Sequence, residues 1–327
     1  MKIIEMSEIY KNDKEAADAL YATAEDLKKE ISKVIVGQKE VVEGVLMSIF
    51  CNGHTLLIGV PGLAKTLLIK TISDVLDLSF NRIQFTPDLM PSDITGTEIL
   101  DDKRNFKFSH GPLFANIILA DEINRTPPKT QAALLEAMQE KTVTVNGTNH
   151  ILPKPFFVLA TQNPIEQEGT YPLPEAQLDR FMFNITLDYP SQEEEIDIVK
   201  NTTSGIEVNV NKIISGNQIL AFQQLVRKVP IADNVLTYAV QLVGKTRPES
   251  EHASDYVKKY LNYGAGPRAS QFLVLGAKCH ALIKGKYSPD IEDVQAVAHY
   301  VLRHRVVKNY QAEAEGITVE SIVKHLL

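Results

Sequence analysis

The chain has 327 residues, a formal net charge of −7, and a hydrophobic content of 44%. This length allows two domains, the composition is ordinary for a soluble globular protein, and the negative charge argues against a surface built for nucleic-acid phosphates. Two cysteines (Cys51 and Cys279), no signal-peptide pattern and no apolar stretch of the ~20 residues that span a bilayer predict a cytoplasmic protein without direct membrane insertion.

Strands and helices alternate through the first part of the chain. Apolar residues at helical spacing predict helices over residues 14–34 and up to Phe50. Five strands are then expected at residues 54–58, 80–85, 116–120, 156–160 and 182–187, with a helix up to Leu76 and another through Met138. Strands separated by helices predict an α/β fold with a doubly wound parallel five-stranded sheet.

Two hairpins interrupt this alternation. The first is expected over residues 98–109, with its turn at residues 101–105. The second is expected over residues 142–152, because Asn146-Gly147 favours a type I′ turn.

The pattern becomes helical after Tyr189. Helices are expected at residues 193–201, 217–229, 234–246, 267–284 and 291–305. We therefore predict two domains, an α/β domain over residues 1–190 and a smaller all-helical domain over residues 191–327.

A candidate phosphate loop connects the first strand of the sheet to its helix. Glycines allow the backbone to approach a ligand closely, and the helix N-terminus favours phosphate. Lys65 would reach the β- and γ-phosphates of ATP, and the Thr66 hydroxyl would bind Mg²⁺. Ala64 stands where the usual pattern has glycine, so this motif alone leaves an ordinary strand–turn–helix open. The motif is Gly59-Val60-Pro61-Gly62-Leu63-Ala64-Lys65-Thr66.

Two adjacent carboxylates follow the apolar run 117–120. A parallel strand ends by pointing its last residues at the ligand crevice, so Asp121 would hold Mg²⁺ directly or through water. Glu122 would polarise the attacking water. The alternative is that the pair only caps the next helix.

Three further polar residues are candidates for the same site. Asn163 follows a strand and could orient the attacking water, although Asn-Pro is also a common turn pair. Arg180 precedes the last strand and is either a surface ion-pair residue or an arginine finger that acts on a neighbouring subunit. Arg268 begins a helix, where a cation is unfavourable unless an anion lies nearby, which favours a phosphate contact.

With these pieces in order, the chain resembles the MoxR family of AAA+ ATPases from about Ile35 to Val307. The resemblance rests on residues 60–66, 85–96, 120–125, 131–140 and 161–181, and Ala64 matches this family's own version of the loop. It implies that Asn163 is the sensor-1 residue, Arg180 the arginine finger and Arg268 the sensor-2 residue. The nucleotide-binding residues are then expected to be Val36, Gly37 and Gln38 near adenine, Val60, Pro61, Gly62, Leu63, Ala64, Lys65, Thr66 and Leu67 at the phosphates, and Arg268.

The resemblance also implies a function and partners. Members are expected to form hexameric rings that use ATP and Mg²⁺ to mature or activate partner proteins, often with a von Willebrand factor A domain protein and sometimes during metal-cofactor insertion. The helical domain would be the lid of the nucleotide site.

Two other functions compete with ATP-driven remodelling. A nucleic-acid motor is disfavoured because the first hairpin balances Asp101 and Asp102 against Lys103, Arg104 and Lys107, and residues 143–149 of the second contain no Lys or Arg. A nucleotide-gated switch with little turnover is disfavoured because Glu122, Asn163 and Arg180 are all present.

Overall fold

A five-stranded parallel sheet forms the centre of the computed structural model, which describes residues 6–100, 102, 105–165, 169–205 and 208–327. The strand order is β2-β5-β8-β1-β9, and every neighbouring pair is parallel. This arrangement confirms the predicted doubly wound sheet. The strands are β1 (Thr55–Ile58), β2 (Phe80–Gln84), β5 (Ile117–Asp121), β8 (Phe157–Gln162) and β9 (Phe183–Thr186).

Helices cover both faces of the sheet because its central strands, β5, β8 and β1, are mostly apolar on both sides. Successive strand residues point to opposite faces, so Leu57 and Leu119 join one apolar cluster while Leu56 and Ile118 join the other. The first cluster packs under α2 (Asp13–Ile31), α3 (Lys39–Phe50) and α4 (Lys65–Val75), and the second under α6 (Pro128–Glu140). Three short helices complete this part: α1 (Met6–Ile9), α5 (Pro91–Thr95) and α7 (Glu175–Leu178).

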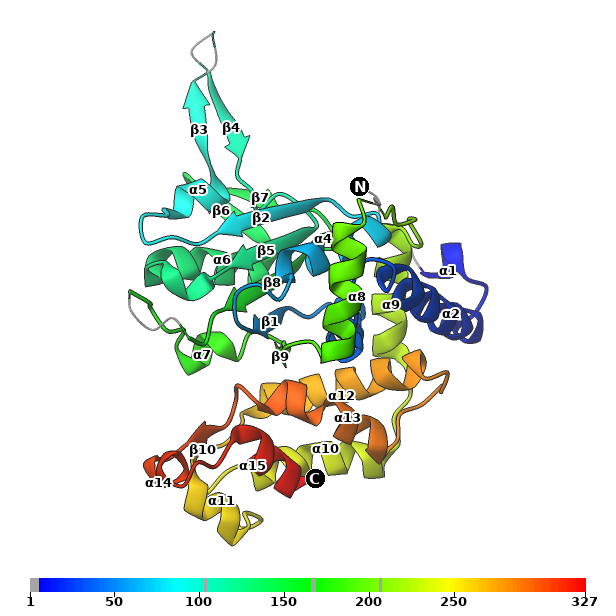
Figure 1. Cartoon of the computed structure of the whole chain (residues 1–327), viewed down its shortest axis with the longest axis vertical. Helices are drawn as coiled ribbons and strands as arrows, with labels where there is room; N and C mark the ends of the chain where they lie inside the picture. The colour runs from blue at the N-terminus through cyan, green and yellow to red at the C-terminus, as the bar shows by residue number, and fades with distance from the viewer. Residues whose placement is uncertain (1–5, 101, 103–104, 166–168, 206–207) are drawn as a thin grey trace.

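Both predicted hairpins are present. In Figure 1 the first, β3 (Gly96–Leu100) with β4 (Phe106–His110), projects away from the sheet. Its predicted turn lies partly outside the described residues, since 101, 103 and 104 are not among them. The second, β6 (Thr142–Val145) with β7 (Thr148–Ile151), turns at Asn146 and Gly147 with the positive φ values of a type I′ turn. The two hairpins touch, because the rings of Phe108 and His150 stack 3.8 Å apart.

The C-terminal part is helical apart from one short ladder of β10 (Leu261–Tyr263) and β11 (Val307–Lys308). Figure 1 shows α10 (Asp233–Lys245), α11 (Asp255–Tyr260), α12 (Pro267–Ile283), α13 (Ile291–Leu302), α14 (Tyr310–Ala314) and α15 (Val319–Leu326) below the sheet. The two preceding helices, α8 (Gln192–Thr203) and α9 (Gly216–Lys228), lie beside the sheet, and α9 packs on α1, α2 and α3. The domain boundary near residue 190 stays a prediction. In the described part of the chain, no helix is long and apolar enough to cross a membrane.

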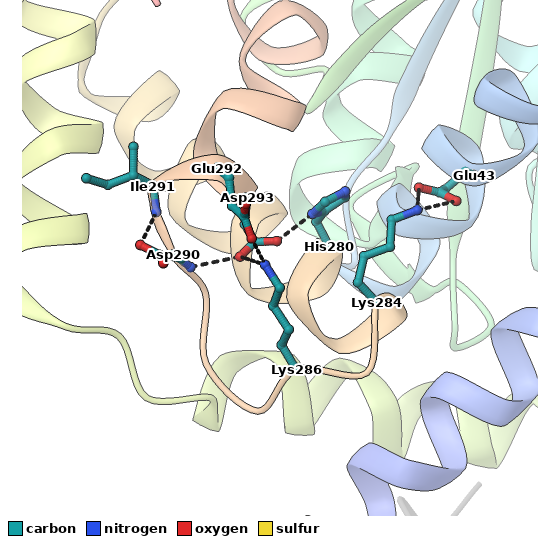
Figure 2. A network of polar contacts seen from close by, with 8 residues as sticks. All are labelled: Glu43, His280, Lys284, Lys286, Asp290, Ile291, Glu292 and Asp293. Carbon is teal, nitrogen blue, oxygen red and sulfur yellow. Dashed lines mark hydrogen bonds and ion pairs between the residues drawn. The ribbon is translucent and has the colours of Figure 1, made fainter.

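Polar contacts organise the helical part and tie it to the sheet. The buried carboxylate of Asp293 lies 2.7 Å from His280 Nδ1 and 3.3 Å from Lys286 Nζ, which joins α12, the following loop and α13 (Figure 2). Lys284 donates to Glu43 of α3 at 2.9 Å, as Figure 2 also shows. These contacts hold α12 against α3.

His54 is buried where β1, β8 and α6 meet. Its Nδ1 accepts a hydrogen bond from the Val158 N–H at 3.0 Å, and its Nε2 lies 3.1 Å from the Met138 carbonyl. Burial, and then the charge of the adjacent Lys141, lower the pKa of His54 well below its ordinary value. The folded protein therefore holds this imidazole neutral.

This neutral histidine is expected to make the protein less stable in acid. As pH falls below ~6.5 the unfolded chain takes up a proton at His54 and the folded chain does not, so the free energy of unfolding drops by up to ~1.4 kcal/mol per pH unit. Urea unfolding at several values between pH 7 and pH 5 measures this slope. His54→Gln should reduce the slope by up to ~1.4 kcal/mol per pH unit without abolishing it, because burial also lowers the pKa values of His299 and His304. His252→Gln at an exposed position should leave the slope unchanged. Equal slopes in all three proteins would contradict the assignment.

Candidate functional site

The loop between β1 and α4 presents free backbone donors to an anion. Gly62 has φ +88° with open space around it, and Ala64, the N-cap residue of α4, is left-handed at φ 54° and ψ 28°. No side chain caps the first turn of α4, so the N–H groups of that turn are available to phosphate. The alanine tolerates a backbone shape that glycine would adopt more readily.

Lys65 is the first residue of α4, directly after this loop, and lies near two carboxylates. Its Nζ donates a hydrogen bond to the Gly59 carbonyl at 2.6 Å. Burial lowers the pKa of Lys65, while the nearby charges of Asp121 and Glu122 act in the opposite direction. An ammonium so placed could donate charge-assisted hydrogen bonds to phosphate oxygens held by the loop.

Asp121 ends the fully buried strand β5. One carboxylate oxygen accepts from the Thr161 hydroxyl at 2.6 Å, and the other accepts from Arg82 Nη2 at 2.7 Å and Nε at 3.1 Å. Because both oxygens already accept hydrogen bonds, Asp121 is better suited to hold Mg²⁺ through a water than directly. The described residues contain no cluster of three or more His, Cys, Asp or Glu that could hold a metal. A hydroxyl from Thr66, the Asp121 carboxylate and nucleotide phosphates are hard oxygen ligands that fit Mg²⁺.

Glu122 follows Asp121 in a left-handed conformation, with φ 58° and ψ 50°. Such a backbone costs a non-glycine residue about 1 kcal/mol or more, and such strain clusters at functional sites. Its N–H donates to Thr161 Oγ1 at 2.9 Å, and its Oε2 accepts from Gln84 at 2.8 Å and Arg125 at 3.1 Å. These contacts hold the Glu122 carboxylate at the carboxyl end of β5. The side chain does not cap the short 3₁₀ helix that follows at Ile123–Arg125.

Asn163 lies one residue beyond β8, on the same sheet edge as Asp121. Its side chain is buried, and Oδ1 accepts from the Ile165 N–H at 3.1 Å. This hydrogen bond closes the turn that the Asn-Pro pair predicts, and it makes Ile165 the partner of the Asn163 side-chain oxygen. Asn163 also lies at the carboxyl ends of the strands, as Asp121 and Glu122 do.

The segment Val36-Gly37-Gln38 lies against the loop. Gln38 Nε2 donates to the Leu63 carbonyl at 3.4 Å, and the carboxylate of Glu194 in α8 lies against Gly37. Gly37 has φ +67°, a backbone conformation that favours glycine. On the exposed side of α4, a hollow of about 420 Å³ is lined by Val34, Leu67, Thr71 and Val210, among others.

Arg180 and Arg268 lie near the amino-terminal ends of the strands, at the opposite end from the phosphate loop. Strands β1 and β9 are parallel, with Thr55 beside Phe183, and the phosphate loop leaves the far end of β1. Because a strand of four residues spans ~13 Å, Arg180, which precedes β9, is well removed from Lys65 of its own chain. Arg180 Nη1 donates to the Leu135 carbonyl at 2.9 Å.

Arg268, in the first turn of α12, pairs with the Asp179 carboxylate at 3.3 Å. The anion beside Arg268 is therefore the Asp179 carboxylate, where the sequence predicts a phosphate. The phosphate contact of Arg268 stays a prediction.

Sequence reasoning missed three side chains on the neighbouring strands that contact the two site carboxylates. Arg82 and Gln84 alternate along β2, and Thr161 lies in β8. Polar residues at alternate positions near a strand end were the available signal. Their proximity depends on β2 and β8 flanking β5.

Comparisons with known proteins agree with this geometry. Residues 54–183 match the model of the ATPase family associated with various cellular activities (AAA), and residues 254–326 match an AAA lid domain. A solved structure of a putative ATPase from Cytophaga hutchinsonii superposes with a TM-score of 0.89 at 45% identity, covering 95% of both chains.

Curated relatives extend the similarity over most of the chain. Chaperone MoxR1 of Mycobacterium tuberculosis is 43% identical, over 95% of this chain and 83% of the relative. YeaC, an uncharacterised protein of Bacillus subtilis, is 42% identical over 91% of each chain. Protein MoxR of Methylorubrum extorquens is 27% identical over 85% of each.

Proposed function

The chain belongs to the MoxR family of AAA+ ATPases, and from that premise we propose that it binds ATP with Mg²⁺ and hydrolyses it. The observation that carries the proposal is the meeting of Lys65, Asp121 and Glu122 at the carboxyl edge of the sheet, beside an uncapped helix N-terminus. A positive loop and two carboxylates at one edge are the parts that nucleotide hydrolysis needs.

Each residue has a distinct role in this proposal. The Lys65 ammonium and the N–H groups of the loop bind the β- and γ-phosphates, and Thr66 and Asp121 hold Mg²⁺, which neutralises phosphate charge when bound. Glu122 accepts the proton of the attacking water, and the Asn163 amide orients that water. Val36, Gly37 and Gln38 would contact the adenine, and Leu67 would complete the phosphate-binding segment.

The site would be completed by a second copy of the chain. Arg180 and Arg268 are too far from their own phosphate loop, so in a ring, proposed to be a hexamer, they would act on the neighbour's ATP. A guanidinium suits this role because its planar donors match phosphate oxygens.

The work done with ATP is proposed to be the remodelling of a protein client. The projecting β3–β4 hairpin carries exposed apolar side chains at Ile99, Leu100 and Phe106, the last with 74% exposure. Apolar patches of this kind support protein contact over nucleic-acid contact. A von Willebrand factor A domain partner and a part in metal-cofactor insertion remain proposals drawn from the family resemblance. A cytoplasmic location is proposed from the cysteine usage, two free buried thiols.

Lys65→Ala tests the nucleotide site. The variant should lose tight ATP binding, because an ammonium in a water-poor phosphate site cannot be replaced by solvent. Equilibrium binding of a fluorescent ATP analogue measures the loss. Lys129→Ala, which removes an exposed lysine from the first turn of α6, is the matched control and should bind normally. Retained affinity in Lys65→Ala would mean that the phosphate site lies elsewhere.

A further inference from the structure

Arg305, from the helical part of the chain, is buried against the segment that carries Arg180. It follows α13, and its side chain is only 2% exposed. Nε donates to Asp179 Oδ1 at 2.7 Å, and Nη2 donates to the carbonyls of Asp179 at 2.9 Å and Phe181 at 2.5 Å. Nη1 donates to the carbonyls of Met182 at 3.2 Å and Val301 at 2.5 Å. All five N–H donors of the guanidinium are thereby used.

The acceptors of Arg305 lie on both sides of Arg180. The carbonyl oxygens of residues 179, 181 and 182 all accept hydrogen bonds from the Arg305 guanidinium. These bonds fix the main chain on either side of residue 180. Neighbouring residues strengthen the contact, since His304 Nε2 lies 3.0 Å from the Phe181 carbonyl and Arg303 donates to Thr186 Oγ1 at 2.8 Å. The run 303–305 thus docks along residues 179–186.

The charge arrangement also favours a positioning role. Asp179 pairs with Arg305 through one oxygen and with Arg268 through the other, so two guanidinium groups share a single carboxylate next to Arg180 in the chain. Burial lowers the pKa of Arg305 to about 10, and Asp179 opposes that shift, so the group stays charged at neutral pH. Burying such a charge is costly unless its bonds are all satisfied. A buried leucine or methionine at position 305 would hold the segment after α13 against residues 179–182 at a lower cost in free energy. It would not orient the carbonyls of residues 179, 181 and 182.

We propose that Arg305 is a positioning residue for Arg180: it holds residues 179–182 so that the Arg180 guanidinium reaches a neighbouring subunit's nucleotide, and it thereby links the helical part of the chain to that finger. This inference rests on the proposed action of Arg180 on a neighbour's ATP. A finger displaced by about 1 Å loses ~10²-fold in rate. Movement of the helical part relative to the sheet would move the finger as well.

Arg305→Lys keeps the charge and loses the planar fork. The variant should bind ATP with unchanged affinity and lower kcat by ~10–100-fold, because Arg180 is misplaced and not removed. Arg227→Lys is the matched control: it makes the same change at an exposed arginine in the last turn of α9, outside the contact of residues 303–305 with 179–186, and should leave kcat near that of the unmodified protein. Thermal unfolding of both variants separates a loss of stability from a loss of rate. Asp179→Asn, which keeps the carbonyl acceptors, is the second variant if Arg305→Lys does not fold.

Subunit mixing distinguishes positioning from a purely structural role. Mixing Arg305→Lys with Glu122→Gln should restore part of the activity, because some interfaces then join an intact Glu122 to an intact finger. Mixing Arg305→Lys with Arg180→Ala should restore nothing, since every finger is damaged. An unchanged kcat of Arg305→Lys overturns the inference. So does a result in which Arg180→Ala regains activity when mixed with Glu122→Gln but Arg305→Lys does not. If Arg180→Ala also fails to recover with Glu122→Gln, the action between subunits is wrong and the inference falls with it.

Discussion

Arg180→Ala is expected to lower ATP turnover by ~10³–10⁵ while leaving ATP affinity unchanged, because an arginine finger stabilises charge only in the transition state. The Arg180 side chain lies near the amino-terminal ends of the strands, away from the phosphate loop of its own chain, and donates a hydrogen bond to the Leu135 carbonyl. Steady-state phosphate release gives the turnover, and binding of a nucleotide analogue gives the affinity.

The mixture of Arg180→Ala with Glu122→Gln tests where the finger acts. Each variant alone should be nearly inactive, but a mixed ring contains interfaces with an intact Glu122 and an intact neighbouring Arg180. Activity should therefore exceed the sum of the two separate proteins. Arg247→Ala, at a lid residue that donates to the Ala265 carbonyl, provides an arginine-loss control that should retain turnover. If mixing restores nothing, Arg180 is not an intersubunit finger.

Glu122→Gln is expected to lower turnover by ~10²–10⁴ with ATP binding retained, because the general base is lost while the side-chain shape remains. The amide oxygen can still accept hydrogen bonds from Gln84 and Arg125, which hold Oε2 of the carboxylate at 2.8 and 3.1 Å. Local geometry should survive, so the loss reports chemistry. Single-turnover measurements with excess protein isolate the hydrolysis step from product release.

The matched control for Glu122→Gln is Glu251→Gln, the same change at an exposed position in the helical part. It should leave both turnover and binding near those of the unmodified protein. Turnover of Glu122→Gln close to normal would assign this residue to structure, and the protein would then act as a nucleotide-gated switch or use another base.

Features encoded by neighbouring residues could be read from the sequence alone. The strand, loop and helix around Lys65, the adjacent carboxylates Asp121 and Glu122 after an apolar run, and the turn at Asn146-Gly147 all depend on residues within a few positions of one another. Apolar runs flanked by helical patterns likewise predicted the parallel sheet. Backbone geometry and hydrophobic periodicity act over such short distances, so these patterns sufficed to predict the family resemblance and the candidate phosphate site.

Only the tertiary structure decided which distant residues meet. Arg82 and Gln84 lie 39 and 38 residues before their carboxylate partners and reach them because β2 is the neighbour of β5 in the sheet. The pairing of Arg268 with Asp179, and the clamp of Arg305 on either side of Arg180, join segments 89 and 126 residues apart. No local pattern specifies such contacts, because they follow from strand order and from how the helical part packs on the sheet, which the whole apolar core determines.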